Sequence, residues 1–181
     1  MLRQAGHGDA EQIAALVNLA YRPGPAQRGW THEAELVSGA RVSVAQVGAL
    51  IAGGGAVLVT CDGQVVVGCV HIEPAGDICG IGMLATHPAW QDRGLGRALL
   101  AAAEALAVSR FAATGFSLSV LSARPELLAY YERRGYRPTG ARSPYPVDAG
   151  VGSPRVRGLE VIELLKPGAA QVSAASGLSA E

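Results

Sequence analysis

The chain has 181 residues, a formal net charge of zero and a hydrophobic content of 49%. A chain of this length is expected to form one domain with a sizeable core, and its balanced charge gives no sign of a nucleic-acid or membrane-surface partner. Its apolar runs are interrupted well before the ~20 residues of a membrane span, and its first residues lack the apolar core of a secretory signal. The three cysteines lie in expected strands without metal-ligand spacing, which favours buried reduced thiols in a cytoplasmic protein over disulfides or a metal site.

The first half of the chain is expected to contain two helices followed by a run of strands. Apolar residues recur at helical spacing in the helices, and β-branched runs on either side of Asp62-Gly63 indicate a hairpin. The expected elements are helices over 9–21 and 42–52, and strands over 56–60, 65–73 and a segment that ends at Thr86.

The second half alternates between helices and strands. The expected elements are helices over 94–108 and 124–134, strands over 116–121 and 159–166, and a short strand or extended segment over 136–140. A right-handed crossover through the first of these helices makes the strands on either side of it parallel. The segment 143–158, rich in Pro and Gly, is expected to be a mobile surface loop. The predicted organisation is one domain over 1–166 and a disordered tail over 167–181, which has little to bury.

The most informative stretch is the polar loop between the strand that ends at Thr86 and the next helix. It reads Gln91-Asp92-Arg93-Gly94-Leu95-Gly96-Arg97. The first turn of a helix has N–H groups without internal partners, and glycine lets an anion approach the backbone. The loop is neither a Walker loop nor a dinucleotide fingerprint. From these residues alone it is either an anion-binding loop or a glycine-containing turn with solvated charges.

The wider string resembles motif A of the GCN5-related N-acetyltransferases, the GNAT superfamily. The matching residues are Leu84-Ala85-Thr86-His87-Pro88, then Gln91-x-x-Gly94-x-Gly96, then Arg97-Ala98-Leu99-Leu100. A second segment, Tyr130-Tyr131-Glu132-x-x-Gly135-Tyr136, is similar to the family's F-Y-E-x-x-G-F. The resemblance implies the GNAT fold, an α/β (α+β) architecture with a mixed central sheet of about six to seven strands flanked by about four helices. It also implies an enzyme that transfers the acetyl group of acetyl-coenzyme A to a primary amine, by direct attack through a tetrahedral intermediate and without a metal.

In this family the loop amides hold the pyrophosphate of acetyl-coenzyme A, and an interruption between two parallel strands frees amides for the thioester. The resemblance therefore implies that a backbone N–H near Leu84 or Ala85 stabilises the oxyanion. Arg124 stands where the family often has an asparagine that touches pantetheine. The implied coenzyme-binding residues are Leu84, Ala85, Thr86, Gln91, Asp92, Arg93, Gly94, Leu95, Gly96, Arg97, Arg124 and Tyr131.

Tyr131 occupies the position of the family's tyrosine that protonates the departing thiolate. A phenol has a reference pKa near ~10, so it is protonated at neutral pH and can donate to sulfur. Leu127 shares its helix face, so a core or rim aromatic is the alternative, and Tyr130 is the second candidate for the acid.

The general base is the point at which this sequence departs from the family. Gly80 and Gly82 stand where many members carry a glutamate. His71 and Glu73 share one face of the neighbouring strand by alternation, and they are the candidate catalytic substitutes, acting through a water. A hydrogen-bonded sheet histidine and a solvated strand end are the alternatives.

The N-terminal region resembles a pattern in one branch of the family, in which this region shapes the acceptor site. Trp30, Glu33 and Arg41 are therefore candidate acceptor-binding residues, with Glu33 suited to an ammonium and Arg41 to a carboxylate. A Trp packed over the loop and an intramolecular Glu–Arg pair are the alternative. The expected partner is a small-molecule or peptide amine, and the resemblance also allows a homodimer. A non-catalytic acyl-coenzyme A binding or sensing module is the second hypothesis, based on the missing strand carboxylate.

Overall fold

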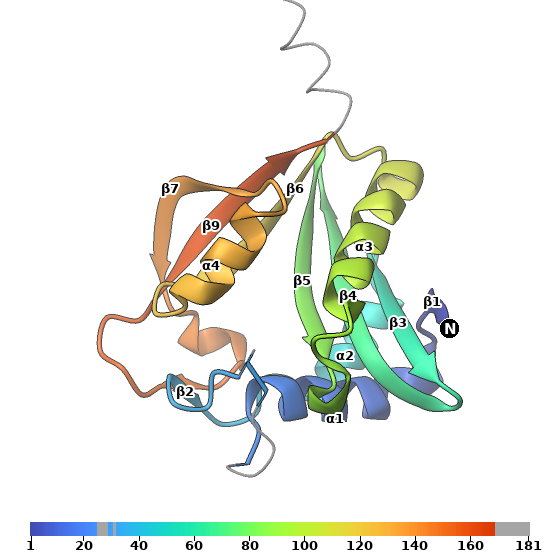
Figure 1. The fold of residues 1–181 in the computed structure, drawn as a ribbon, viewed down its shortest axis with the longest axis horizontal. Coiled ribbons are helices and arrows are strands. Elements are labelled where there is room, and N and C mark those ends of the chain that lie inside the picture. The colour runs from blue at the N-terminus through green and yellow to red at the C-terminus, as the bar shows by residue number, and fades with distance from the viewer. Residues whose placement is uncertain (25–28, 31, 169–181) are drawn as a thin grey trace, which may run out of the picture.

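The computed structural model describes residues 1–24, 29–30 and 32–168. Its centre, within these residues, is a mixed seven-stranded β-sheet (Figure 1). In spatial order the strands are β1 (Leu2–Gln4), β3 (Ala56–Asp62), β4 (Val65–Ala75), β5 (Ile78–Thr86), β6 (Gly115–Leu121), β9 (Glu160–Pro167) and β7 (Arg137–Pro144). β5 and β6 are parallel as the sequence predicts, and the other neighbours are antiparallel.

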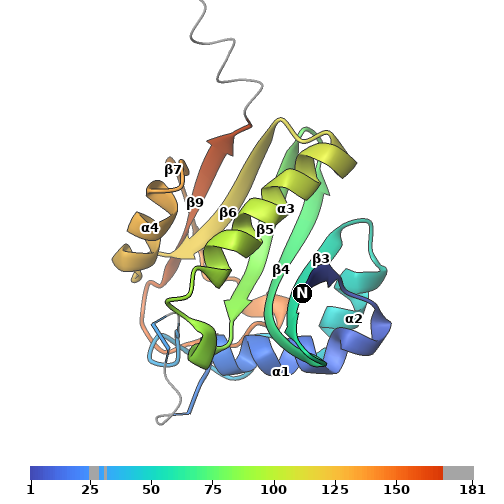
Figure 2. The same ribbon diagram turned by 45° about the vertical axis from the view of Figure 1, so that its right-hand side comes forward.

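Helices cover both faces of this sheet. The α-helices of the described residues are α1 (Ala10–Tyr21), α2 (Val44–Ala52), α3 (Leu95–Phe111) and α4 (Pro125–Glu132). The short 3-10 helices are η1 (His7–Asp9), η3 (Pro88–Trp90) and η4 (Val147–Ala149). α3 and α4 lie on one face, and α1 and α2 lie on the other (Figure 2). The expected architecture, a mixed sheet with helices on both sides, is confirmed.

Alternation along the strands divides the apolar core into two clusters. Leu58 packs with the α3 and α4 side, whereas Val57 and Val59, its neighbours in β3, pack with α1 and α2. α3 contributes Leu99, Leu100, Ala103 and Ala107 to the first of these clusters. Both clusters meet the central strands, which therefore have little freedom to move relative to the helices.

Among the element boundaries that differ from the expected ones are the start of α2 and the end of β9. A side-chain cap determines the first, and contacts with a distant segment determine the second. α2 begins at Val44 because Ser43 Oγ accepts from the Gln46 N–H at 3.1 Å and Gln46 Oε1 accepts from the Ser43 N–H at 2.8 Å. β9 includes Pro167, and the Gly168 N–H donates to the Thr114 carbonyl at 2.7 Å, so the ordered chain passes the expected limit at 166. The rest of the predicted disordered tail, 169–181, lies outside the described residues.

The segment 143–158 is more structured than the expected surface loop. Its strand β8 (Ser153–Pro154) pairs with β2 (Val37–Ser38) of the N-terminal region. Tyr145 is buried in a cluster with Val37, and its hydroxyl donates to the Val151 carbonyl at 2.8 Å. The sequence pattern cannot reveal this pairing because the two strands are too short to carry an alternation signal.

No helix among the described residues has the length and apolarity of a membrane span. Cys61, Cys69 and Cys79 are buried and free, and burial raises the pKa of the Cys69 thiol to about 12. The same part of the chain has no group of three or more His, Cys, Asp or Glu side chains placed to hold a metal ion.

Candidate functional site

The site begins at a distortion near the end of β5. Met83 has a φ of 49°, a left-handed conformation that residues other than glycine rarely adopt, and the register between β4 and β5 shifts beside it. Ile81 packs on the α3 side, whereas Met83 and Ala85 pack on the α1 side. Because of this bulge, side chains after Met83 lie on the opposite face from the one that regular alternation predicts. Leu84 therefore lies on the α3 side of the sheet.

Beyond this bulge the two parallel strands separate. The pairing of β5 with β6 ends at Gly80 and Ser117, while β6 continues to pair with β9 up to Leu121 (Figure 1). Two adjoining cavities lined by described residues lie along the separated part of β5. We name them the small cavity, of about 280 Å³, and the large cavity, of about 630 Å³.

The small cavity lies between the end of β5, the loop before α3, and α4. Many of the residues that the motif predicts to bind the coenzyme line it: Leu84, Thr86, Gln91, Asp92, Gly94, Gly96, Arg97 and Tyr131. The other lining residues are Tyr21, Trp30, Leu127, Tyr130 and Arg134. The lining residues from Leu84 to Arg97 therefore form one wall, and the opposite wall, which includes Tyr131, comes from α1, α4 and the segment around Trp30.

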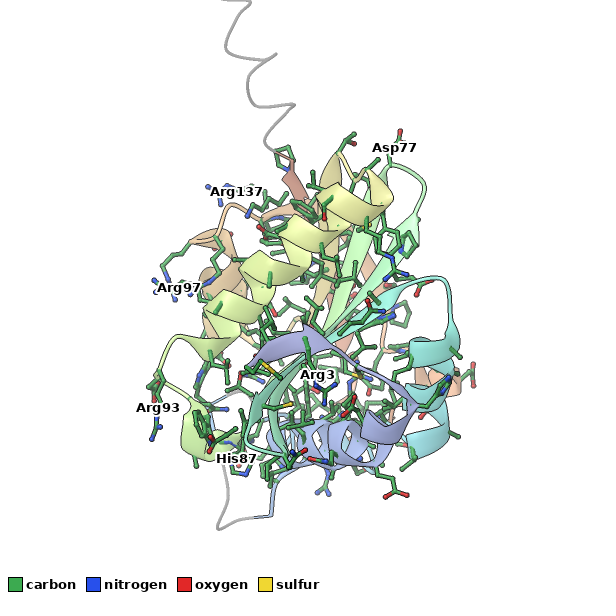
Figure 3. All side chains as sticks on the ribbon, turned by 90° about the vertical axis from the view of Figure 1, so that its right-hand side faces the viewer. Arg3, Asp77, His87, Arg93, Arg97 and Arg137 are labelled. Carbon is green, nitrogen blue, oxygen red and sulfur yellow. The ribbon has the colours of Figure 1, made fainter. Side chains whose placement is uncertain are left out.

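The loop presents backbone N–H groups to this cavity. Asp92 and Gly94 have φ values of 61° and 77°, and α3 starts directly after Gly94, so its first N–H groups have no helical acceptors. A Cβ on Gly96 would lie 3.4 Å from Tyr130 Oη and 3.6 Å from Thr86 Oγ1, so the missing side chain keeps the cavity open here. Arg97 projects from the first turn of α3 at the same edge of the molecule as Arg93 (Figure 3). These features suit a phosphate group.

Three other predicted coenzyme residues lie outside the lining of the small cavity. The Ala85 side chain is buried on the α1 side of the sheet. The Cζ of Arg93 lies 5.0 Å from the centroid of the Trp90 ring. Leu95 packs against the core under α3. It lies next to Gly68 of β4, since a Cβ added to Gly68 would be 3.2 Å from Leu95 Cδ2. The Ala85 and Leu95 side chains thus support the sheet and the helix from the core, whereas the Arg93 side chain is exposed beside Trp90.

Arg124, also predicted to bind the coenzyme, faces the N-terminal segment instead. It is 5% exposed, and its guanidinium donates to the carbonyls of His32 at 2.9 Å and Trp30 at 2.8 Å. It also pairs with Glu126 in the first turn of α4. Arg124 lines neither of the two cavities, and its hydrogen bonds connect the start of α4 to Trp30 and His32.

Four residues line both cavities and mark the place where they join: Tyr21, Leu84, Leu127 and Tyr131. Tyr131 is 9% exposed, and its ring packs edge-on against Tyr130 and Tyr136 at centroid distances of 5.2 and 5.8 Å. Burial raises the pKa of its phenol well above the usual value, so the hydroxyl keeps its proton at neutral pH. Tyr131 thus offers a protonated hydroxyl where the cavities meet.

The two candidate bases lie together in the large cavity. His71 Nε2 is 3.3 Å from Glu73 Oε2, and both residues line the cavity with Gly80 and Gly82. A Cβ on Gly82 would have no heavy atom within 4 Å, so the glycine leaves open space beside His71, its partner across the sheet. Burial lowers the pKa of His71, and the Glu73 carboxylate acts in the opposite direction. The imidazole is therefore neutral at pH 7 and able to accept a proton.

The three predicted acceptor residues separate in the structure. Trp30 lines the small cavity, with its ring 5.5 Å from that of Tyr130, whereas Glu33 and Arg41 line the large cavity. Glu33 Oε2 accepts from Arg22 Nη1 at 2.7 Å, and both side chains are buried. The intramolecular Glu–Arg pair of the alternative interpretation therefore exists, but with Arg22 in place of Arg41.

Tyr21 is a lining residue that the sequence did not single out. It ends α1, and its hydroxyl donates to the Leu84 carbonyl at 2.9 Å, so it holds the bulge of β5 from the side. Burial raises the pKa of this phenol too. The available signal was the string Ala20-Tyr21-Arg22, which is part of the N-terminal pattern and points to a region and not to one side chain.

Residues 53–138 match a family model described as an acetyltransferase (GNAT) domain. A comparison with curated proteins gave no match. Among solved structures, a ribosomal-protein alanine N-acetyltransferase from Escherichia coli is 15% identical with a TM-score of 0.66, covering 92% of each chain. A Salmonella typhimurium protein solved with its cofactor acetyl-CoA is 21% identical, with the same TM-score and coverage. A spermidine N-acetyltransferase variant from Vibrio cholerae is 15% identical with a TM-score of 0.65, covering 97% of this chain and 99% of that one.

Proposed function

We propose that this chain is an acetyltransferase of the GNAT superfamily, which transfers the acetyl group of acetyl-coenzyme A to a primary amine. One observation carries the proposal: Tyr131 lines both cavities. A thioester held in the small cavity and an amine held in the large cavity would meet beside this hydroxyl. The coenzyme supplies an acetyl group that is already activated as a thioester, so the protein has to position two substrates and move protons.

The small cavity suits the coenzyme. The N–H groups after Asp92 and Gly94 are free to bind its pyrophosphate, and Arg97 adds a positive charge on the same turn. Arg134 lies across the cavity, with its Cζ 3.4 Å from the Tyr130 ring centroid. The Salmonella typhimurium protein of the same fold was solved with acetyl-CoA, which supports this choice of donor.

The bulge in β5 offers an amide to the thioester oxygen. The Met83 carbonyl faces Cys69 Sγ at 3.5 Å, on the β4 side. In a trans peptide the following N–H points the opposite way, so the Leu84 N–H is directed toward the gap between β5 and β6. Tyr21 holds the Leu84 carbonyl and thereby fixes this part of the bulge. We assign the Leu84 N–H to stabilising negative charge on the carbonyl oxygen during attack.

Two groups that line the large cavity, His71 and Tyr131, are assigned to proton transfer. As the amine nitrogen bonds to the carbonyl carbon, His71 accepts its proton, directly or through a water, and Glu73 stabilises the imidazolium. As the carbon–sulfur bond breaks, Tyr131 donates a proton or a strong hydrogen bond to the leaving thiolate. The net reaction moves one proton from the amine to the coenzyme thiol, and no other reactant is consumed.

The direct test is release of coenzyme thiol from acetyl-coenzyme A in the presence of a broad panel of primary amines. Acetyl transfer predicts amine-dependent thiol release and an N-acetylated product of the expected mass. A coenzyme-binding module predicts a raised melting temperature with acetyl-coenzyme A and no thiol release with any amine. The second outcome would overturn the enzymatic proposal while leaving the coenzyme site in place.

A further inference from the structure

Positively charged side chains outnumber negatively charged ones around Tyr21 and Tyr145 at the large cavity, with two arginines and one glutamate. Glu33 and Arg41 line this cavity with Tyr21 and Tyr145, and Arg22 lies behind the lining, where it pairs with Glu33. Arg22 binds Glu33 through a buried ion pair and also donates to the Val151 carbonyl at 3.4 Å. The Glu33 carboxylate is thus neutralised by the protein itself, and a buried ion pair of this kind is not readily exchanged for a ligand.

Arg41 carries the positive charge that the pair of Arg22 and Glu33 does not neutralise. Its Cζ lies 5.6 Å from the centroid of the Tyr21 ring, and its side chain lines the large cavity. No carboxylate among residues 1–24, 29–30 and 32–168 pairs with its guanidinium. Its backbone N–H donates to Asn18 Oδ1 at 2.6 Å, which anchors the residue to α1. Burial raises the pKa of the Tyr145 phenol, and Arg22 and Arg41 both oppose this shift, which places their positive charge close to that ring.

The cavity therefore has a positive end at Arg41, while its negative group, Glu73, lies beside His71 on β4. An arginine that faces a partly buried cavity without a carboxylate of its own is suited to bind a carboxylate through two parallel hydrogen bonds. From this charge distribution we infer that the acceptor is a small amine that carries a carboxylate, of the amino-acid class, with Arg41 binding the carboxylate. The inference rests on the proposed acetyl transfer, because it names the acceptor of that same site.

The size of the cavity agrees with a small acceptor. Its volume of about 630 Å³ lies within the range of small-molecule sites. The β2–β8 pairing and the buried Tyr145 bring the C-terminal segment against the N-terminal segment at this end. A purely cationic acceptor such as a polyamine would place a second positive charge in a cavity where Glu33 is already neutralised and Arg41 repels it. The spermidine enzyme of the same fold is thus a guide to the architecture and not to this acceptor.

The experiment uses matched pairs of acceptors that differ only in the carboxylate. Thiol release is measured with each standard amino acid and with its C-terminal amide, and kcat and KM are determined for both. The amide has the less basic amine, because it lacks the neighbouring negative charge, so a larger share of it is reactive at neutral pH. This difference in basicity favours the amide, so a preference for the amino acid cannot come from the share of its amine that is reactive. We expect at least one amino acid to exceed its amide about 10-fold or more in kcat/KM.

Three variants test whether Arg41 causes the preference for an amino acid over its amide. Arg41→Gln should raise KM for the amino acid at least about 10-fold with little change for its amide, and Arg41→Lys should restore part of the preference. Arg142→Gln is the control, because Arg142 is exposed, pairs with Glu160 and lines neither cavity. Affinity for acetyl-coenzyme A should stay unchanged in all three, which verifies folding.

Two results would overturn the inference. One is an active enzyme that uses amides or polyamines as well as amino acids. The other is an Arg41→Gln variant that loses activity equally with both members of a pair, as a structural role would produce. Absence of thiol release with every amine in the wild-type protein would instead contradict acetyl transfer itself.

Discussion

The two cavities are built in opposite ways although they share one wall. The small cavity takes most of its polar groups from one continuous stretch, from Leu84 to Arg97, and the backbone provides many of them. The large cavity takes its polar groups from side chains far apart in the sequence, such as Arg41, His71 and Tyr145. A ligand in the first is recognised by a loop conformation, and a ligand in the second by a combination of side chains.

This difference explains how one fold can keep a donor and change an acceptor. A loop that binds phosphate through N–H groups needs glycines and left-handed residues at fixed positions, and few substitutions preserve it. Side chains that approach from separate segments can be exchanged one at a time without disturbing the sheet. Under the proposed function, residues such as Arg41 and Tyr145, and not the motif, would select the acceptor.

The largest effect on coenzyme binding is expected from changing the backbone of the loop. Gly94 has a φ of 77°, so Gly94→Val forces a β-branched residue into a strained conformation and places a side chain where the phosphate would lie. Affinity for acetyl-coenzyme A should fall at least about 100-fold, as measured by isothermal titration calorimetry.

Gly76→Val is the matched control for this prediction. Gly76 has a φ of 64°, and a Cβ there would meet no heavy atom within 4 Å, so the strain is similar. Its neighbour Asp77 lies at the opposite end of the molecule from Arg93 (Figure 3). If both variants lose coenzyme affinity equally, the loss comes from instability and the loop has no special role.

Tyr131→Phe should act on turnover and not on binding. It removes only the hydroxyl that we assign to the leaving thiolate, and loss of a general acid typically lowers kcat by about 10²–10⁴-fold. The coenzyme dissociation constant should change by less than about threefold, because the ring and its packing remain. Tyr130→Phe tests the second candidate: a larger loss of kcat in that variant would transfer the acid role to Tyr130.

The candidate base predicts a particular pH dependence. His71 must be neutral to accept a proton, so the rate should fall as the pH drops through its pKa, which burial places below the usual 6.5. Glu73→Gln removes a negative charge that raises this pKa, so the acidic limb of the kcat/KM profile should move to lower pH. His71→Gln should abolish that limb and lower kcat by about 100-fold. An acidic limb that stays in place in both variants would exclude His71, and His7→Gln, at an exposed position, is the control.

The sequence predicted the fold and one wall of the site because those depend on local signals. Glycine positions, helical spacing and the Tyr131 segment are readable without knowing which segments meet. The rest depends on contacts between distant parts of the chain, so Tyr21 was missed and the sequence could not identify Arg22 as the partner of Glu33. Alternation also fails at Met83, because a bulge inserts a residue that a regular pattern does not show.

The smallest effect is expected at Arg124, where the family resemblance and the structure disagree about the role. Arg124→Asn restores the residue that the family often has at this position, but it leaves the carbonyls of Trp30 and His32 without their donor. The free energy of unfolding should fall by about 1–3 kcal/mol, as measured by urea denaturation, with coenzyme affinity nearly unchanged. Arg142→Asn, which removes an exposed pair, should alter it by less than about 0.5 kcal/mol. Lower coenzyme affinity at unchanged stability would show that Arg124 contacts the coenzyme and that its bonds to Trp30 and His32 contribute little to folding.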